Sequence, residues 1–210
     1  MSRQLDPIVL EGRHVRLEPL SRVHVPALAA AGTSGPRETY AFTWVPGSEA
    51  DAATYVEEAL KLHAAGKALP FATIDAKTGR VVGSTRYLNV EFWPWPPGNP
   101  LQRGEALPDV VEIGATWLAP AAQRTAINTE AKLLMLTHAF ETWRVHRVSL
   151  LTDARNMRSR HAIERLGAKL DGVIRAARVA ADGGIRDTAV FSIVEREWPA
   201  VKAGLEAKLG

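Results

Sequence analysis

Apolar and polar positions alternate with a period of two in several short segments, which is typical of half-buried strands. In the segment 14–21, Val15 and Leu17 alternate with polar neighbours, and the pattern stops at Pro19. Similar short runs, bounded by turn residues, predict further strands at 69–76, 80–90, 110–118, 146–152, 168–180 and 185–195. The chain is therefore predicted to contain about seven strands.

Other segments repeat apolar residues at intervals of three and four, which favours helices. The best specified helix follows Ser48, a predicted N-cap with Asp51 three residues later, and it ends at Gly66. Similar patterns predict helices at 22–32, 129–143, 157–167 and 196–209. Five prolines interrupt the segment 91–109, so we expect a long surface loop there, close to the functional site.

The order of these elements predicts an α/β (mixed α+β) fold. Strands 69–76 and 80–90 form an antiparallel hairpin with Gly79 in its turn. From residue 110 onward strands alternate with helices, which implies parallel pairing in that half, and 168–195 closes the chain as a hairpin. We expect a central mixed, partly parallel twisted sheet of about seven strands, with helices on both faces, in a single domain over residues 1–210.

Composition narrows the class of protein. The 210 residues are 46% hydrophobic and 23% charged, which suits one globular domain. No apolar run approaches the roughly 18 residues of a membrane span, and no secretion signal is recognisable. The absence of cysteine excludes disulfides and thiolate sites, and it suits a reducing compartment. We therefore expect a cytoplasmic protein without a membrane partner.

Charge and histidine spacing argue against two further kinds of site. The formal net charge of +3 is too small to demand a polyanion, so no nucleic-acid partner is expected. The six histidines include no pair at a spacing of four, so no metal site is expected.

The segment 119–136, APAAQRTAINTEAKLLML, follows the strand 110–118. Open sheets with parallel strands bind ligands beyond the carboxyl ends of those strands. A turn that leads into a helix there presents unpaired N–H groups and the positive end of the helix dipole to a phosphate. We expect a phosphate-bearing ligand at this turn, the alternative being an ordinary helix start with no ligand.

Three stretches carry a resemblance to a known family. NTEAKLL (128–134), TDARNMRSRHAIERLGA (152–168) and RDTAVFSIVEREWP (186–199) resemble the GCN5-related N-acetyltransferase (GNAT) family, in its RimJ/RimL-like branch. The resemblance covers about residues 10–197. It implies a GNAT-like fold and transfer of an acyl group from acetyl-CoA, used as cosubstrate without a metal, to an amine.

The resemblance also implies a set of cofactor contacts. The family's phosphate loop, Q/R-x-x-G-x-G/A, corresponds here to residues 123–128, with Ala126 in place of the central glycine. Because Ala126 would begin a helix, its φ is expected to be negative and the cradle to work without glycine. Arg124 is expected to face the phosphates. The expected acetyl-CoA contacts are Trp117, Leu118, Gln123, Arg124, Thr125, Ala126, Ile127, Asn128, Thr129, Asn156 and Ser159.

An amine that attacks a thioester needs a base, an oxyanion donor and an acid for the leaving thiolate. Glu112 is the expected base, because it is an acidic residue inside an otherwise apolar strand, although a solvated strand face would also explain it. The backbone N–H of Leu118 is the candidate oxyanion donor. Ser159 is the candidate acid, since Ile163 stands where other branches of the family have a tyrosine.

The acceptor side is predicted from aromatic residues in irregular segments. Trp44 and Trp93 could form an aromatic wall around an amine, or they could anchor their loops. Two functions stay open from the sequence. One is an N-acetyltransferase acting on a protein or peptide N-terminus or a small amine. The other is a non-catalytic acyl-CoA-binding or interaction protein, and either could be a monomer or a homodimer.

Overall fold

The computed structural model describes residues 5–210, and their strands form one open mixed sheet. The strands are β1 (Leu10–Glu11), β2 (Val15–Pro19), β3 (Ala68–Asp75), β4 (Val81–Glu91), β5 (Val110–Leu118), β6 (Arg147–Asp153), β7 (Lys169–Val179) and β8 (Ile185–Val194). Their order in the sheet is β1-β2-β3-β4-β5-β6-β8-β7. The predicted fold class is confirmed, with eight strands in place of about seven. The additional strand β1 has two residues, too few to show an alternating pattern.

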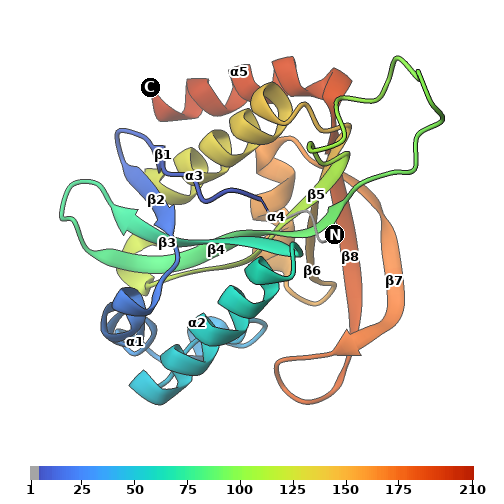
Figure 1. Cartoon of the computed structure of the whole chain (residues 1–210). Helices are drawn as coiled ribbons and strands as arrows, with labels where there is room; N and C mark the ends of the chain where they lie inside the picture. The colour runs from blue at the N-terminus through green and yellow to red at the C-terminus, as the bar shows by residue number, and fades with distance from the viewer. Residues whose placement is uncertain (1–4) are drawn as a thin grey trace.

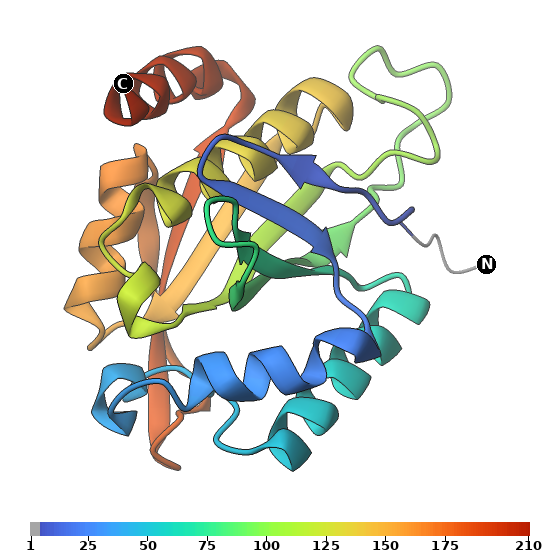
Figure 2. The ribbon, with the colours of Figure 1, turned by 90° about the vertical axis from the view of Figure 1, so that its left-hand side faces the viewer.

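Helices cover both faces of the sheet (Figures 1 and 2). The α-helices are α1 (Val25–Gly32), α2 (Glu49–Ala64), α3 (Ala126–Thr137), α4 (Met157–Leu166) and α5 (Trp198–Leu209). The 3-10 turns are η1 (Arg22–His24), η2 (Arg37–Tyr40), η3 (Pro120–Ala122) and η5 (Glu195–Glu197), and a π-helical turn, η4 (His138–Thr142), extends α3. Helices α1 and α2 lie together on one face, and α3 and α5 lie on the other (Figure 2). None of the helices within residues 5–210 has the length and apolar character needed to cross a membrane.

Each face of the sheet has its own hydrophobic core. The larger core lies between the sheet and the helices α3 and α5, and it contains fully buried residues such as Phe71, Met135 and Phe191. The smaller core joins α1 and α2 to the opposite face, with Leu28 and Val56 completely buried. Two layers of helices packed on a sheet follow from strands that carry apolar side chains on both faces.

Polar side chains cap the N-termini of three helices. Ser48 accepts a hydrogen bond from the N–H of Asp51, which confirms it as the N-cap of α2. Asn156 accepts from the N–H of Ser159 and caps α4. Helix α3 begins at Ala126, three residues earlier than predicted, because Thr125 caps it by accepting from the N–H of Ile127.

The strand pairing in the second half is only partly the predicted one. β5 and β6 are parallel, but β8 lies between β6 and β7 and is antiparallel to both, so the prediction of parallel pairing was wrong for 168–180. The physical reason is the composition of the closing hairpin. β8 buries Ala189, Phe191 and Ile193 completely, whereas β7 is exposed along almost its whole length and therefore lies at the edge.

The sheet opens between β5 and β6. These strands pair from Val110 to Glu112 of β5, and beyond Glu112 no described residue of β5 pairs with β6. On its other side β5 contains a bulge, because Trp117 pairs with Ser84 but Gly114 pairs with Arg86. The bulge places Ala115 at a φ of 48° and leaves backbone groups out of the ladder. The two strands therefore diverge toward their carboxyl ends.

Candidate active site

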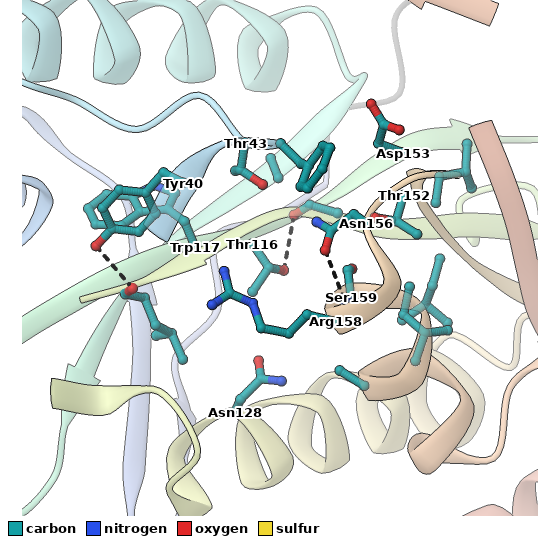
Figure 3. A pocket seen from close by; sticks show the side chains of 18 of the residues that line it. Tyr40, Thr43, Thr116, Trp117, Asn128, Thr152, Asp153, Asn156, Arg158 and Ser159 are labelled. Carbon is teal, nitrogen blue, oxygen red and sulfur yellow. Dashed lines mark hydrogen bonds between the residues drawn. The ribbon is translucent and has the colours of Figure 1, made fainter. Parts of the chain in front are cut away.

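A cavity of about 770 Å³ occupies the space between the diverging ends of β5 and β6 (Figure 3). Its walls come from η2 and the loop after it, α2, β4, the segments 113–118 and 123–129, β6, α4 and the tip of the β7–β8 hairpin. The volume falls within the range of ordinary small-molecule sites, about 300–1,000 Å³. The position is the one expected for an open sheet, at the carboxyl ends of parallel strands.

The turn before α3 forms one end of this cavity. The side chain of Gln123 donates to the carbonyl of Leu118 at 2.9 Å, and the hydroxyl of Thr125 donates to the carbonyl of Ala122 at 2.8 Å. Positive φ occurs at Arg124 (60°), whereas Ala126 is the first residue of the helix and lies outside the left-handed region. Glycine is therefore not required at position 126 by backbone conformation.

Most of the residues predicted to contact acetyl-CoA line this cavity. They are Trp117, Leu118, Gln123, Arg124, Thr125, Asn128, Thr129, Asn156 and Ser159. Ala126 and Ile127 do not line it with their side chains, and Ile127 packs in the larger core with 7% of its surface exposed. Both residues belong to the first turn of α3.

The second wall is the segment from the end of β6 into α4 (Figure 3). The Asn156 side chain is held by its cap bond to the N–H of Ser159, at 3.0 Å. Arg155 forms ion pairs with Asp153 and with Asp182 in the β7–β8 turn, at 2.8 and 2.9 Å. Hydrogen bonds from Arg155 lower the pKa of Asp153, so this carboxylate is ionised and already paired.

Glu112 is buried next to the cavity, although its side chain does not line it. It has 8% of its surface exposed, and the side-chain amide of Asn89 donates to its carboxylate at 2.6 Å. Gly114 lines the cavity, and a Cβ there would lie 2.6 Å from Glu112 Oε1, so the carboxylate occupies the space beside this glycine. Burial raises the pKa of Glu112, while Asn89, Arg178 and Arg186 act in the opposite direction.

Lys132 is a second buried ionisable residue, and sequence reasoning missed it. Its ammonium donates to Thr116 Oγ1 at 2.7 Å and to Thr85 Oγ1 at 3.1 Å, and it lines the cavity. Within residues 5–210 it has no acidic partner. Burial lowers its pKa to about 7.

The two tryptophans predicted for the acceptor side have different positions. Trp44 lines the cavity, with half of its surface exposed, and stacks on Tyr55 with ring centroids 5.8 Å apart. Trp93 does not line the cavity and instead stacks on His146. Its loop is held by Asp109, which accepts from the Trp93 N–H just before β5 begins, whereas the cavity lies where β5 ends.

Two further cavity residues escaped the sequence analysis. The Tyr40 hydroxyl donates to the carbonyl of Leu118 at 3.2 Å, but its segment shows no periodic pattern that could have predicted this contact. Arg86 is 6% exposed, and its guanidinium lies 4.7 Å from the centre of the Tyr55 ring. An arginine in the middle of the predicted strand 80–90 was the only sequence signal for Arg86, and it does not show which way the side chain points.

No group of three or more histidine or acidic side chains suited to a metal ion occurs in the described part of the chain. The lining of the cavity combines apolar side chains with several basic ones, among them Arg86, Arg124 and Lys132, and basic side chains suit a ligand that carries phosphate groups.

Comparison with known proteins identifies relatives of this chain. A curated relative from Bacillus subtilis (strain 168), named "Putative ribosomal N-acetyltransferase YdaF", is 32% identical over 91 residues, which are 43% of this chain and 49% of the relative. The match thus spans about half the length of that relative. A GCN5-related N-acetyltransferase structure from Brucella melitensis has a TM-score of 0.79 and 31% identity, covering 99% of this chain and 87% of its own.

A Mycobacterium smegmatis RimJ structure, in complex with CoA-disulfide, shares the fold with a TM-score of 0.75, at 20% identity over 97% of this chain and 93% of its own. Residues 14–169 match the Acetyltransferase (GNAT) domain family. The resemblance found in the sequence is thereby confirmed, and the chain belongs to the GNAT acetyltransferase family.

Proposed function

We propose that this protein transfers the acetyl group of acetyl-CoA to a primary amine, either a protein or peptide N-terminus or a small amine. The observation that carries the proposal is the cavity between β5 and β6, with the turn 123–129 at one end and Glu112 beside Gly114. Membership of the GNAT family supports it. A protein acceptor is supported by the name of the Bacillus subtilis relative, which describes a ribosomal N-acetyltransferase.

Acetyl-CoA would bind along the diverging strands. The first turn of α3 offers N–H groups and the positive end of its dipole to the pyrophosphate, with the guanidinium of Arg124 close by. Residues 113–118, which have no partner strand on the β6 side, offer backbone groups to the pantetheine arm. Asn156 and Ser159 would flank the thioester end of the cofactor.

The reaction would proceed by direct attack. The amine nitrogen forms a bond to the thioester carbonyl carbon, and the C–S bond breaks with its electron pair leaving on the sulfur. Glu112 would take the amine proton directly or through one water, and a backbone N–H such as that of Leu118 would stabilise the oxyanion. The proton returns to the thiolate, with Ser159 as the nearest candidate donor.

Calorimetric titration with acetyl-CoA and with desulfo-CoA, followed by measurement of thiol release against a panel of amines and peptides, tests this proposal. Saturable binding and release of free thiol are the expected results. Binding without release to any acceptor would favour the alternative of a non-catalytic acyl-CoA-binding protein. A lack of binding would contradict both.

The proposal includes a cytoplasmic setting and action as a monomer or homodimer, with no nucleic-acid or membrane partner. The absence of cysteine and the small net charge support it.

A further inference from the structure

Arg86 is a buried cation at the cavity, and residues 5–210 provide no anionic partner for it. Only 6% of its surface is exposed, it lines the cavity, and its Nε has no hydrogen-bond partner. Within residues 5–210 no carboxylate forms an ion pair with it, and its one recorded side-chain contact is the face of the Tyr55 ring. The hydroxyl of Tyr55 is also buried and without a partner.

A buried unpaired charge is costly, so its retention in a cavity points to an anion supplied by a ligand. A guanidinium offers two parallel N–H donors that match the two oxygens of a carboxylate. The Tyr55 hydroxyl adds a third donor beside them.

The position of Arg86 assigns it to the acceptor half of the cavity. Arg86 pairs with Gly114 across β4 and β5, so both lie on the face covered by α1 and α2, where Tyr55 is located. The phosphate cradle belongs to α3, which covers the opposite face. Glu112 pairs with Leu88, two residues further along β4, so Glu112 and Arg86 are diagonal neighbours on one face. Such neighbours have Cα atoms roughly 7–8 Å apart.

The surrounding charges also favour an anionic acceptor. Arg178 and Arg186 occupy opposite positions on the neighbouring strands β7 and β8, and both line the same cavity. The acidic residues of the lining are Asp153, which Arg155 neutralises, and Glu58, which is exposed at the rim. A positive surface of this kind attracts an acceptor that carries negative charge and disfavours a purely cationic one.

We propose that Arg86, with the Tyr55 hydroxyl, binds a carboxylate on the acceptor, so that the acceptor is a primary amine with an acidic group a few bonds from the reacting nitrogen. This inference rests on the proposed acetyl transfer. The carboxylate has two possible sources, which are the α-carboxylate of a free amino acid and an acidic side chain at the second position of a peptide.

Matched pairs of acceptors test the inference and separate the two sources. Alanine against alaninamide probes the α-carboxylate, and the C-terminally amidated dipeptides Ala-Asp and Ala-Asn probe the side chain. With the wild-type protein we expect kcat/KM from thiol release to be about 10- to 100-fold higher for the carboxylate member of at least one pair. Equal values in both pairs would overturn the inference while leaving acetyl transfer intact.

Substitution of Arg86 then identifies the residue responsible. Arg86→Gln should remove the preference by lowering kcat/KM for the carboxylate acceptor about 10- to 100-fold, with a change below about threefold for its amide. Arg86→Lys keeps the positive charge but lacks the two parallel N–H donors of the guanidinium, so it should retain part of the preference that Arg86→Gln loses. Arg22→Gln, which removes an arginine from an exposed ion pair with Glu57, is the matched control and should change neither value.

Two measurements keep this test independent of turnover and of folding. N-acetylalanine, N-acetylalaninamide and the corresponding acetylated dipeptides are titrated into protein saturated with CoA. The carboxylate ligand of a pair should bind the wild type and lose about 10-fold or more in affinity with Arg86→Gln. Equal binding would overturn the inference even if no acceptor is turned over, whereas preferential binding without thiol release would contradict only the proposed acetyl transfer.

Acetyl-CoA affinity and thermal unfolding of Arg86→Gln should match the wild type, and a parallel loss of acetyl-CoA affinity would assign Arg86 to the cofactor instead.

Discussion

Glu112 and Lys132 are buried ionisable residues beside one cavity, and burial acts on them in opposite directions. Burial favours the neutral form of each side chain, so it raises the pKa of the Glu112 carboxyl and lowers that of the Lys132 ammonium. The carboxylate has a hydrogen-bond donor in Asn89, whereas the amine has only hydroxyl acceptors. Both residues therefore change protonation closer to neutral pH than they would in water.

Substitution of Glu112→Gln tests its role as a base. We expect kcat to fall about 100-fold or more, since general bases contribute on that scale, while the Kd of acetyl-CoA is unchanged. In the wild type, kcat/KM should fall on the acid side at a higher pH than the usual glutamate pKa of about 4.3 would give, because protonation removes the base. Asn89→Ala removes a hydrogen bond that lowers this pKa, so it should move the acidic limb to still higher pH. A Glu112→Gln variant with unchanged rate would remove Glu112 from the mechanism.

Lys132→Met should reveal the free energy that burial of the amine costs. The folded pKa of about 7 lies below the unfolded value of 10.5. The unfolded chain therefore takes up a proton as pH falls from about 10.5 to 7, and the folded protein does not. The wild type should lose stability over this range relative to the methionine variant, by on the order of a few kcal/mol, with no further difference below pH 7.

Urea denaturation of Lys132→Met and the wild type at several pH values between 6 and 10 measures this difference. Thr85 and Thr116 hydrogen-bond each other at 2.7 Å in the wild type, so each hydroxyl is expected to keep a partner in the variant. A difference in unfolding free energy that does not vary with pH would show that the amine is not neutral in the folded protein.

At the scale of elements, α3 connects the proposed cofactor site to the rest of the fold through one motif, NTEAKLL. Asn128 and Thr129 face the cavity, and Glu130 faces the opposite way, toward the turn between β1 and β2. The Glu130 carboxylate accepts from the N–H groups of Arg13, His14 and Val15 at 2.5–2.9 Å. The motif that indicated the family in the sequence thus joins ligand-facing and structural residues.

Glu130→Ala should destabilise the fold by about 2–4 kcal/mol, because three N–H groups lose a charged acceptor. Urea denaturation measures the effect, and Glu164→Ala on the exposed face of α4 is a control expected to change stability by less than about 0.5 kcal/mol. If Glu130→Ala changed the unfolding free energy as little as the control, water would replace the carboxylate as acceptor for these N–H groups, and the contact would contribute little to stability.

Ala126→Gly tests whether the cradle needs its missing glycine. Because φ at Ala126 is helical and positive φ occurs at Arg124, we expect the Kd of acetyl-CoA to stay within about twofold of the wild type. Calorimetric titration of the two proteins measures this. A large gain in affinity would show that the Ala126 methyl group obstructs the phosphate, and a large loss would place the phosphates elsewhere.

At the scale of the whole molecule, the sequence predicts the elements better than it predicts their neighbours. The strands and helix caps follow from local periodicity and from residues such as Ser48 and Asn156. The insertion of β8 beside β6 depends on burial from both faces, and local alternation does not record it. For the same reason Trp44 and Trp93 looked alike in the sequence, although one lies at the end of β5 and the other at its beginning. Arg86, Lys132 and Tyr40 reach the cavity only through tertiary packing.

Because β5 and β6 stop pairing at Glu112, we expect the stability of this part of the sheet to depend on the bound ligand. Beyond Glu112 these strands lack the hydrogen bonds that join the other neighbouring strands, so acetyl-CoA would connect them with the turn 123–129 and with α4. A ligand that binds only the folded state stabilises it by about 2.7 kcal/mol at 100 times its Kd. We expect acetyl-CoA to raise the unfolding temperature and to slow amide hydrogen exchange at 113–118, 123–129 and 150–153.

Desulfo-CoA should protect the same segments, because it keeps the phosphates and the pantetheine arm. Exchange in β3, which pairs with both β2 and β4 and is separated from the opening by β4 and β5, provides the internal reference. Protection at the turn 123–129 without protection of β5 and β6 would mean that the nucleotide end binds while the arm does not enter between the strands. The thioester would then not reach Glu112, and this result would contradict the proposed position of the thioester in acetyl transfer.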